Sequence, residues 1–405
     1  LTVPADPLTR FREEWYRALA TMTAGALAGT AGQQPPAREA TLTQTWSLPP
    51  ATYEEQPQST LEVIPADLDG DGVDEILAIR GRYLTCIDAA GRVMWEFDGT
   101  DELYAACAWD VDGDGAQEVF CGGKSKLLYV LEPDGTLIRE HPIETYWRVS
   151  RTTIHEPRLD DVLVRDFDGD GNWEAVLGTV DGFTQGIDRD FKQVWIYGET
   201  NHGTTELQAV DVDGDGTLEV AVGNRYGKLF VFDALTGKVR TRVTSELGDV
   251  QMAVADLDGD GTFEALNGSA TGAFKCGRVG SRDVAWEFPN YGYAFRDIKI
   301  ADVAASPGLE PIIASDTGYV YVLAADGATL TSRDLGAAVL DLAVDGAEIA
   351  AGCLDGSVYL LDGELEEIGL GSLPARVNSV IMCRTGNGVQ LVAGSENGSV
   401  AMLSR

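Results

Sequence analysis

Residues 67–75 read DLDGDGVDE, and the same nine-residue pattern, D-x-D-G-D-G-x-x-E, returns four more times along the chain. The other copies are DVDGDGAQE at 110–118, DFDGDGNWE at 166–174, DVDGDGTLE at 211–219 and DLDGDGTFE at 256–264. Each copy is followed by an alternating apolar run, a turn with glycine and a second alternating run, as in EILAIRGRYLTCIDAAGRVMWEF. This order is typical of short antiparallel strands joined by tight turns.

The strand–turn–strand frame continues after the acidic pattern ends, as EPIIASDTGYVYVLAADG, EIAAGCLDGSVYLLDG and QLVAGSENGSVAMLS show. The residues that end each loop, or take that place, are Glu75, Glu118, Glu174, Glu219, Glu264, Glu310, Glu348 and Gln390. Their spacing is close to the ~40–45 residues of a four-stranded propeller blade. We therefore predict an all-β fold, an eight-bladed β-propeller with four-stranded blades. The alternative is seven blades, with one degenerate unit being something else.

The last unit stops at Arg405, one strand short. The segment TLTQTWSLP, around Trp46, resembles later segments around Trp95, Trp195 and Trp286. We therefore expect the two ends of residues 41–405 to close the last blade together, which removes an exposed sheet edge. Residues 1–40 read as a short helix and a linker. Asp6 and Pro7 suit its start, and one helical stripe holds Leu8, Phe11, Trp15, Leu19 and Met22.

The acidic pattern concentrates oxygen ligands around one point. Its carboxylates stand at positions 1, 3, 5 and 9, and the glycines at positions 4 and 6 allow a tight backbone curl. Several hard oxygen donors suit Ca²⁺, whereas Mg²⁺ demands an octahedron and dehydrates reluctantly. The loop is not an EF-hand, because no glutamate stands at position 12 and a strand follows. The predicted Ca²⁺ ligands are Asp67, Asp69, Asp71, Glu75, Asp110, Asp112, Asp114, Glu118, Asp166, Asp168, Asp170, Glu174, Asp211, Asp213, Asp215, Glu219, Asp256, Asp258, Asp260 and Glu264.

The formal net charge of −35 argues against nonspecific nucleic-acid binding. It fits either a salt-adapted surface or many carboxylates that bind metal. No run approaches the roughly 18 apolar residues of a membrane span. Leu1 is not followed by a signal peptide, so we expect a mature or excised piece, with an upstream domain as one candidate partner. The six cysteines read as buried thiols, with one candidate bridge between Cys107 and Cys121.

These repeats resemble the FG-GAP and VCBS-type calcium propellers of integrin heads and bacterial secreted proteins. The segments GKLFVFDALTGKVR and GRYLTCIDAAGRVMWEF also resemble the quinoprotein-type propeller repeat. The resemblance covers residues 41–405 and implies the fold and the calcium loops, but it spans unrelated activities. Because extracellular calcium modules bind at about 10⁻⁴–10⁻³ M, we expect an extracellular or periplasmic protein.

If each calcium loop joins the innermost strand of a blade to the second strand, ligands should bind on the opposite face. Candidate ligand-binding residues there are Arg80, Arg82, Lys124, Trp147, Arg158, Asn201, Arg225, Tyr226, Tyr293 and Arg296. An insertion before the third unit, TYWRVSRTTIHEPRLDD, and later connections add candidate catalytic residues: Arg148, Arg151, His155, His202 and Tyr291. They indicate a site for an anionic ligand, with aromatic rings for sugars. Surface ion pairs with neighbouring acids are the alternative.

Three functions fit this pattern. The first is a non-catalytic module that binds an acidic polysaccharide or a protein. The second is a polysaccharide lyase or related glycan-degrading enzyme, in which an arginine neutralises a uronate and a histidine or tyrosine moves the proton. The third is a quinone-cofactor dehydrogenase, which the absence of an adjacent cysteine pair disfavours.

Overall fold

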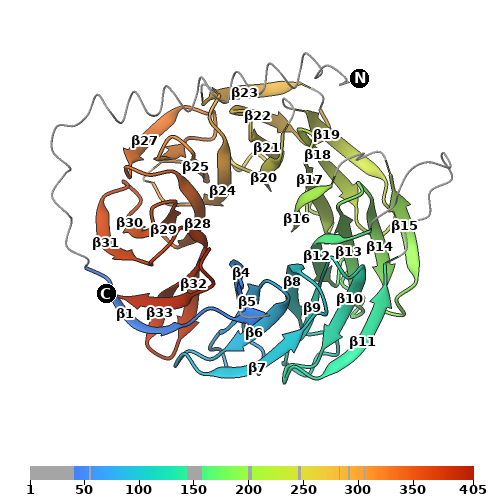
Figure 1. The fold of residues 1–405 in the computed structure, drawn as a ribbon. Helices are drawn as coiled ribbons and strands as arrows, with labels where there is room; N and C mark the ends of the chain where they lie inside the picture. The colour runs from blue at the N-terminus through green and yellow to red at the C-terminus, as the bar shows by residue number, and fades with distance from the viewer. Residues whose placement is uncertain are drawn as a thin grey trace, which may run out of the picture. The chain divides into compact units, whose positions relative to one another are not determined.

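The computed structural model describes residues 41–53, 56–143, 157–198, 203–244, 248–281, 283–290, 292–304 and 306–405. The chain divides into two units, Leu1–Ala40 and Thr41–Arg405. The predicted helix and linker of residues 1–40 lie outside the described residues. Within those residues the fold is all-β, with eight four-stranded antiparallel sheets arranged as blades around an axis (Figure 1). The prediction of an eight-bladed propeller is confirmed.

The first four blades follow the chain from the inside of the ring to its outside. Blade 1 has β4 (Thr60–Ala66), β5 (Glu75–Arg80), β6 (Tyr83–Ile87) and β7 (Val93–Asp98). Blade 2 has β8 (Leu103–Trp109), β9 (Glu118–Gly123), β10 (Leu127–Leu131) and β11 (Leu137–Pro142). Blade 3 has β12 (Leu159–Arg165), β13 (Glu174–Thr179), β14 (Thr184–Asp188) and β15 (Gln193–Tyr197). Blade 4 has β16 (Thr204–Val210), β17 (Glu219–Asn224), β18 (Lys228–Asp233) and β19 (Val239–Thr244).

The remaining blades repeat this order, except that the last is built from both ends of the unit. Blade 5 has β20 (Val250–Ala255), β21 (Glu264–Ser269), β22 (Ala273–Arg278) and β23 (Val284–Pro289). Blade 6 has β24 (Phe295–Ala301), β25 (Glu310–Ser315), β26 (Tyr319–Leu323) and β27 (Thr329–Asp334). Blade 7 has β28 (Val339–Asp345), β29 (Glu348–Cys353), β30 (Ser357–Leu361) and β31 (Glu367–Ser372). Blade 8 has β32 (Val377–Thr385), β33 (Gly388–Ser395), β34 (Val400–Ser404) and β1 (Thr43–Leu48).

Strand β1 closes the ring as predicted. It pairs antiparallel with β34, with Trp46 opposite Met402 and Ser47 opposite Ala401. Between β1 and blade 1, β2 (Thr52–Tyr53) and β3 (Gln56–Pro57) form a small separate hairpin that the repeat pattern did not predict.

The core lies between the blades, with one apolar cluster at each junction of the described ring. The cluster between blades 1 and 2, for example, packs Leu77 and Ile79 against Val119 and Cys121. Each second strand faces neighbours on both sides, so all six positions of β5 are buried. The outermost strand β7 has only partly buried or exposed positions. Partly buried and exposed side chains alternate along most of β7, because only one face of this outermost strand is covered by other residues.

Tryptophans join neighbouring blades near the outer edge. The Trp95 indole N–H donates to the carbonyl of Pro133 in the next blade at 2.9 Å, and its ring lies against Gly135. Trp46, Trp195 and Trp286 donate in the same way to Ala89, Ala234 and Ala325. A Cβ on Gly135 would lie 2.6 Å from the Trp95 ring, which explains the glycine in that turn.

Carboxylates on the innermost strands join neighbouring blades near the axis. Asp161 accepts the Leu207 N–H at 2.7 Å, and Glu206 accepts the Met252 N–H at 3.3 Å. Asp297 accepts the Leu342 N–H at 2.9 Å, and Asp341 accepts the Val380 N–H at 2.7 Å. Each bond satisfies a backbone donor of the following blade, so these acids help to fix the order and spacing of the blades.

Candidate functional site

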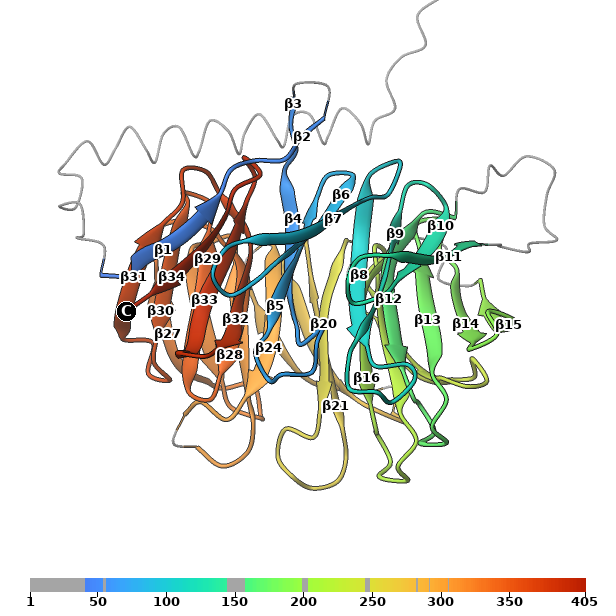
Figure 2. The same cartoon turned by 90° about the horizontal axis from the view of Figure 1, so that it is seen from below.

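The five acidic loops join the first strand of a blade to the second, as the sequence predicted. They therefore lie on one rim of the ring, where the long connections between β16 and β17 and between β20 and β21 project (Figure 2). Gly70 and Gly72 have φ angles of 73° and 84°, and both glycines of the other four loops also have positive φ. The glycines at positions 4 and 6 are thus required by the backbone conformation.

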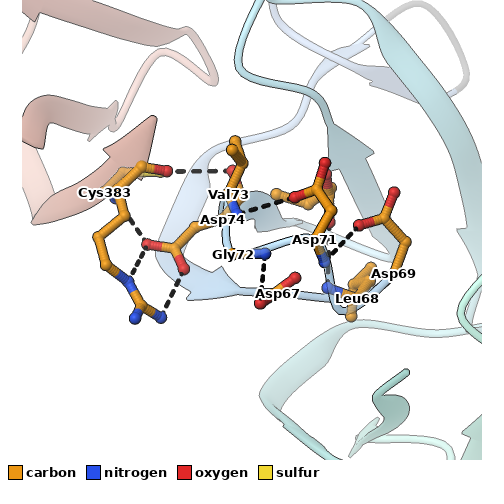
Figure 3. Close-up of polar contacts among 10 residues, drawn as sticks. Asp67, Leu68, Asp69, Asp71, Gly72, Val73, Asp74 and Cys383 are labelled. Carbon is orange, nitrogen blue, oxygen red and sulfur yellow. Dashed lines mark hydrogen bonds and ion pairs between the residues drawn. The ribbon is translucent and has the colours of Figure 1, made fainter. Parts of the chain in front are cut away.

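Hydrogen bonds within the first loop hold its carboxylates in place (Figure 3). Asp67 accepts the Gly72 N–H at 3.0 Å, and Asp71 accepts the Val73 N–H at 2.8 Å. Glu75, at position 9, reaches back to accept the Leu68 N–H at 3.0 Å. All five loops repeat these three bonds. These bonds use only groups of the chain, so the backbone of the loop itself holds the carboxylates in position.

The remaining carboxylate oxygens converge. In every loop, three acidic side chains each have a ligand atom within 4.8 Å of the others, for instance those of Asp67, Asp69 and Asp71. Asp67 Oδ1 and Asp256 Oδ1 are buried and have no hydrogen-bond partner among the described residues. A buried oxygen without a partner is unfavourable, and a cation would satisfy it. This oxygen-only donor set fits Ca²⁺.

The glutamates at position 9 have raised pKa values when no cation is present. Burial raises the pKa of Glu75 and of Glu174 to about 7; the Leu68 and Phe167 amides oppose this rise, while neighbouring aspartates add to it. Burial likewise raises the pKa of Glu118, Glu219 and Glu264. Crowded carboxylates thus favour either a proton or a cation at this position.

Blade 6 keeps the frame of the loop, with Asp302 and Glu310 at its ends, but has lost the acids between them. Glu310 Oε2 accepts the Val303 N–H at 2.9 Å, as Glu75 does for Leu68. Ala304 and Ser306 stand where the acidic loops have aspartates at positions 3 and 5, and Pro307 stands in place of the second glycine. Among the described residues, no acidic cluster with converging ligand atoms forms in this blade.

Two arginines reach the acidic loops from elsewhere, and sequence reasoning missed both. Arg240, on β19, pairs with Asp213 and with Glu219, the latter at 2.7 Å. Arg384, at the end of β32, pairs with Asp74 at 3.0 Å and so joins blade 8 to the first loop (Figure 3). No local spacing could reveal these contacts, because they cross a blade or the closure of the ring.

Much of the predicted ligand site lies outside the described residues: Trp147, Arg148, Arg151, His155, Asn201, His202 and Tyr291. Four of the described candidate cations on the face opposite the acidic loops have acidic partners. Arg82 pairs with Asp98 at 2.6 Å, and Lys124 lies 3.4 Å from Asp101. Arg225 pairs with Asp160 at 3.4 Å, and Arg296 pairs with Asp316 at 2.6 Å. Ion pairing on the surface accounts for these four contacts.

The other described candidates differ in exposure. Arg80 is buried and donates to the carbonyls of Pro49 and Gly398, which joins blade 1 to the closing segment. Arg158 Nε is buried without a hydrogen-bond partner in the described residues. Tyr226 and Tyr293 are exposed. The described candidates thus lie at strand ends on the face opposite the acidic loops, and Arg80 makes a structural contact.

All six cysteines are free thiols. Cys107 pairs with Phe120 and Cys121 with Ala106 across β8 and β9. Since residues directly opposite share a face of the sheet, Cys107 and Cys121 point to opposite faces. The candidate bridge is therefore wrong by one residue of register.

The innermost strands carry a second group of acids. Burial raises the pKa of Asp161 and Glu206 to about 8, and that of Asp341 to about 7. Lys299 lies 3.1 Å from Asp297 and supplies a positive charge within this ring. The backbone bonds of these acids show that their first role is to join blades.

Comparison with known proteins supports the propeller fold, and one family model matches part of the chain. Residues 59–158, 100 of the 405, match the model of the lambda-carrageenase beta-propeller domain. No match was found among curated proteins. Similar solved structures include the computationally designed Ika8 protein, at 15% identity and TM-score 0.69, covering 89% of this chain and 99% of that one. BamB from Moraxella catarrhalis has 16% identity and TM-score 0.61, covering 90% and 98%. Sqt1 from Saccharomyces cerevisiae has 12% identity and TM-score 0.68, covering 89% and 99%.

At these identities the structural similarity shows a shared fold and nothing finer. The family match reaches from the start of blade 1 to the connection before blade 3. No helix in the described part of the chain is long and apolar enough to cross a membrane.

Proposed function

We propose that this chain is a calcium-stabilised β-propeller module that binds an anionic glycan on the face opposite its acidic loops. The observation that carries the proposal is the match of residues 59–158 to a propeller domain of lambda-carrageenase. That name denotes action on carrageenan, a sulfated galactan. The match includes residues 143–158, the connection in which the arginine-rich insertion lies.

The calcium part rests on the acidic loops. Five copies bring at least three carboxylates together, and each copy is shaped by its own backbone hydrogen bonds. Clustered carboxylates repel one another unless a cation holds them. The loops resemble those of the FG-GAP and VCBS-type propellers. A cation bound there would act on stability, because each loop links the first two strands of a blade.

The glycan part rests on charge. In a chain of net charge −35, the insertion between β11 and β12 places Arg148, Arg151 and Arg158 within 11 residues. Guanidinium groups bind sulfate or carboxylate as bidentate partners. A glycan ligand and calcium sites of the extracellular type both fit a protein that works outside the cytoplasm.

A second candidate is a glycan-degrading enzyme, which the carrageenase match also favours. Its catalytic residues would be His155, His202 or Tyr291 with Arg148 or Arg151. Incubation with carrageenan and with uronate-containing polysaccharides tests it. New reducing ends indicate cleavage, and absorbance from unsaturated uronate indicates a lyase. Binding without either product supports the module.

The binding experiment uses carrageenan, a polyuronate and neutral agarose as probes. Replacing Arg148 and Arg151 with Ala should weaken binding to the anionic probes by about tenfold or more and leave the melting temperature unchanged. Asp213→Ala should lower the melting temperature in calcium and leave glycan affinity unchanged. Added salt should weaken binding. Equal binding by the double variant and the parent would contradict the proposed site.

A further inference from the structure

The acidic loops, numbered here as loops 1 to 5 after their blades, are not all connected to one another in the same way. The N–H of Gln117, at position 8 of loop 2, donates to the carbonyl of Leu68, at position 2 of loop 1, at 3.1 Å. Likewise, the Leu218 N–H of loop 4 donates to the Phe167 carbonyl of loop 3 at 2.7 Å. A backbone hydrogen bond therefore joins loop 1 to loop 2 and loop 3 to loop 4.

The corresponding bonds between loops 2 and 3 and between loops 4 and 5 are missing. All residues of these four loops are described. Within them, no backbone hydrogen bond joins Trp173 to Val111 or Phe263 to Val212, the residues at the same two positions. Loops 2 and 4 are thus each bonded to one neighbouring acidic loop and not to the other.

The side chains at these two positions differ in step with the bonds. Where the bond is present, position 2 carries the bulkier residue, Leu68 or Phe167, and its side chain is buried. Where the bond is absent, position 2 is a valine and position 8 is aromatic. Both of these side chains pack in the core cluster of that junction, as Val111 and Trp173 do. Residue size therefore marks which acidic loops are joined.

Loop 5 has no acidic partner. Its Leu257 carbonyl accepts the Leu309 N–H of blade 6 at 2.8 Å, and the loop of blade 6 has lost its central acids. The rim thus carries two pairs of joined acidic loops and one single acidic loop.

The hydrogen bond between loops 1 and 2 connects two predicted calcium ligands. Glu75, at position 9 of loop 1, accepts the Leu68 N–H at 3.0 Å, while the carbonyl of Leu68 accepts the Gln117 N–H. Gln117 directly precedes Glu118, the ligand at position 9 of loop 2, which accepts the Val111 N–H at 3.0 Å. Leu68 is therefore bonded both to a ligand of its own loop and to the residue next to a ligand of the following loop.

Loop 1 also packs closely against loop 2. A Cβ on Gly70, at position 4 of loop 1, would collide with the carbonyl oxygen of Gly115 in loop 2. A Cβ on Gly169, Gly214 or Gly259, at the same position of loops 3 to 5, would meet no atom within 4 Å. A change in the shape of loop 1 therefore reaches loop 2 directly.

We propose that calcium binds to these loops as two coupled pairs, loops 1 and 2 and loops 3 and 4, with loop 5 independent. This coupling rests on the calcium part of the proposed function and adds its regulation. A cation fixes the carboxylates of one loop and, through position 9, the residue at position 2. The joined loop then loses less conformational entropy when it binds its own cation. Each member of a pair should raise the calcium affinity of the other, and linkage makes the effect reciprocal.

Charge has the opposite effect on neighbouring loops, and it does not select a pair. Calcium in one loop weakens the negative field at the loops on both sides. Salt at about 0.15 M screens this effect, because the Debye length there is about 8 Å. The hydrogen bond acts on one side only. A difference between the two neighbours of a loop therefore isolates the contribution of the bond.

The test is hydrogen exchange of the full chain across a calcium titration at about 0.15 M salt. It is measured peptide by peptide, so that each loop reports the calcium concentration at which it is half protected, its midpoint. Asp168→Ala, which disables loop 3, should raise the midpoint of loop 4 by about threefold or more and should not raise that of loop 2. Asp112→Ala, in loop 2, should raise the midpoint of loop 1 and not that of loop 3. Asp258→Ala, in loop 5, is the control and should raise the midpoint of no other loop.

A matched pair of glycine substitutions tests the contact between loops 1 and 2 without removing a carboxylate. Gly70 and Gly259 both have a φ of 73°, so alanine strains the two backbones alike. Gly70→Ala should raise the midpoints of loops 1 and 2, because the new Cβ meets Gly115. Gly259→Ala should raise the midpoint of loop 5 alone.

The outcomes separate this coupling from the proposed function. If calcium changes the exchange of no loop, the calcium part of the proposed function is wrong, and the coupling is wrong with it. If every loop responds to calcium but Asp168→Ala shifts loops 2 and 4 equally, or shifts neither, the coupling alone is wrong. The same conclusion follows if Asp112→Ala leaves loop 1 unchanged or if Gly70→Ala changes loop 1 only.

Discussion

At the scale of single residues, a carboxylate in an acidic loop has two roles. One oxygen of Asp67 accepts the Gly72 N–H, and the other is buried without a hydrogen-bond partner in the described residues. The first role shapes the loop, and the second presents a ligand. Leaving a buried oxygen unpaired costs about 1–3 kcal/mol, so a bound cation should stabilise the blade.

Arg240 should compete with calcium in blade 4, because its guanidinium contacts Asp213 and Glu219. We expect Arg240→Gln to raise the calcium affinity of this loop by about tenfold and to lower the melting temperature of calcium-free protein. Calcium titration of the variant and the parent measures both effects. Arg92→Gln, which removes an arginine from a turn without the acidic pattern, is the control. An unchanged titration curve would mean that Arg240 does not face the ion.

The turn glycines provide a matched pair of substitutions. Gly135 and Gly280 both have φ of 83°, but only at Gly135 would a new Cβ meet a tryptophan, at 2.6 Å from the Trp95 ring. Both alanine variants should lose about 1 kcal/mol or more to backbone strain. Gly135→Ala should lose a further ~1–3 kcal/mol from the clash. Urea unfolding of the two variants side by side measures the difference, and equal losses would refute the packing argument for Trp95.

At the scale of elements, the loops were predictable and their surroundings were not. Nine consecutive residues bring together the ligand oxygens of Asp67, Asp69 and Asp71, so a pattern along the chain is sufficient. The partners of Asp74 and Glu219 come from β32 and β19, and a linear pattern does not contain such contacts. The candidate bridge between Cys107 and Cys121 failed for a related reason, since register is set by the pairing of whole strands.

The same elements predict a pH dependence. The pKa of Glu75 and Glu174 in the calcium-free fold is about 7, above the ordinary 4.5. Between these values the folded chain binds more protons than the unfolded chain, so its stability should fall as pH rises from about 4.5 to 7. Calcium should replace the proton. The rise in melting temperature on adding calcium should therefore be larger near pH 8 than near pH 5.5.

Melting curves with excess chelator or excess calcium at both pH values measure this prediction. Asp161 and Glu206 on the innermost strands, with pKa about 8, should leave a residual fall in stability with rising pH even in calcium. Glu206→Gln is the control, because it should reduce that residual without changing the calcium-dependent part. A calcium effect of the same size at both pH values would contradict the linkage.

At the scale of the whole molecule, the repeat made the ring predictable, because each blade buries its faces only against its neighbours. The blade count and the closure by β1 followed from counting repeats and noting the missing strand. The ligand site was less predictable. Pairing of Arg82, Arg225 and Arg296 with acids depends on which loops become neighbours in space.

The central claim is that five acidic loops hold calcium and thereby stabilise the propeller. The most direct measurement is the calcium content of dialysed protein by elemental analysis, followed by the melting temperature after chelation. We expect five ions per chain, four in Asp213→Ala, and a strong fall in melting temperature when calcium is removed. One ion or none per chain, with a melting temperature that excess chelator does not change, would contradict the claim.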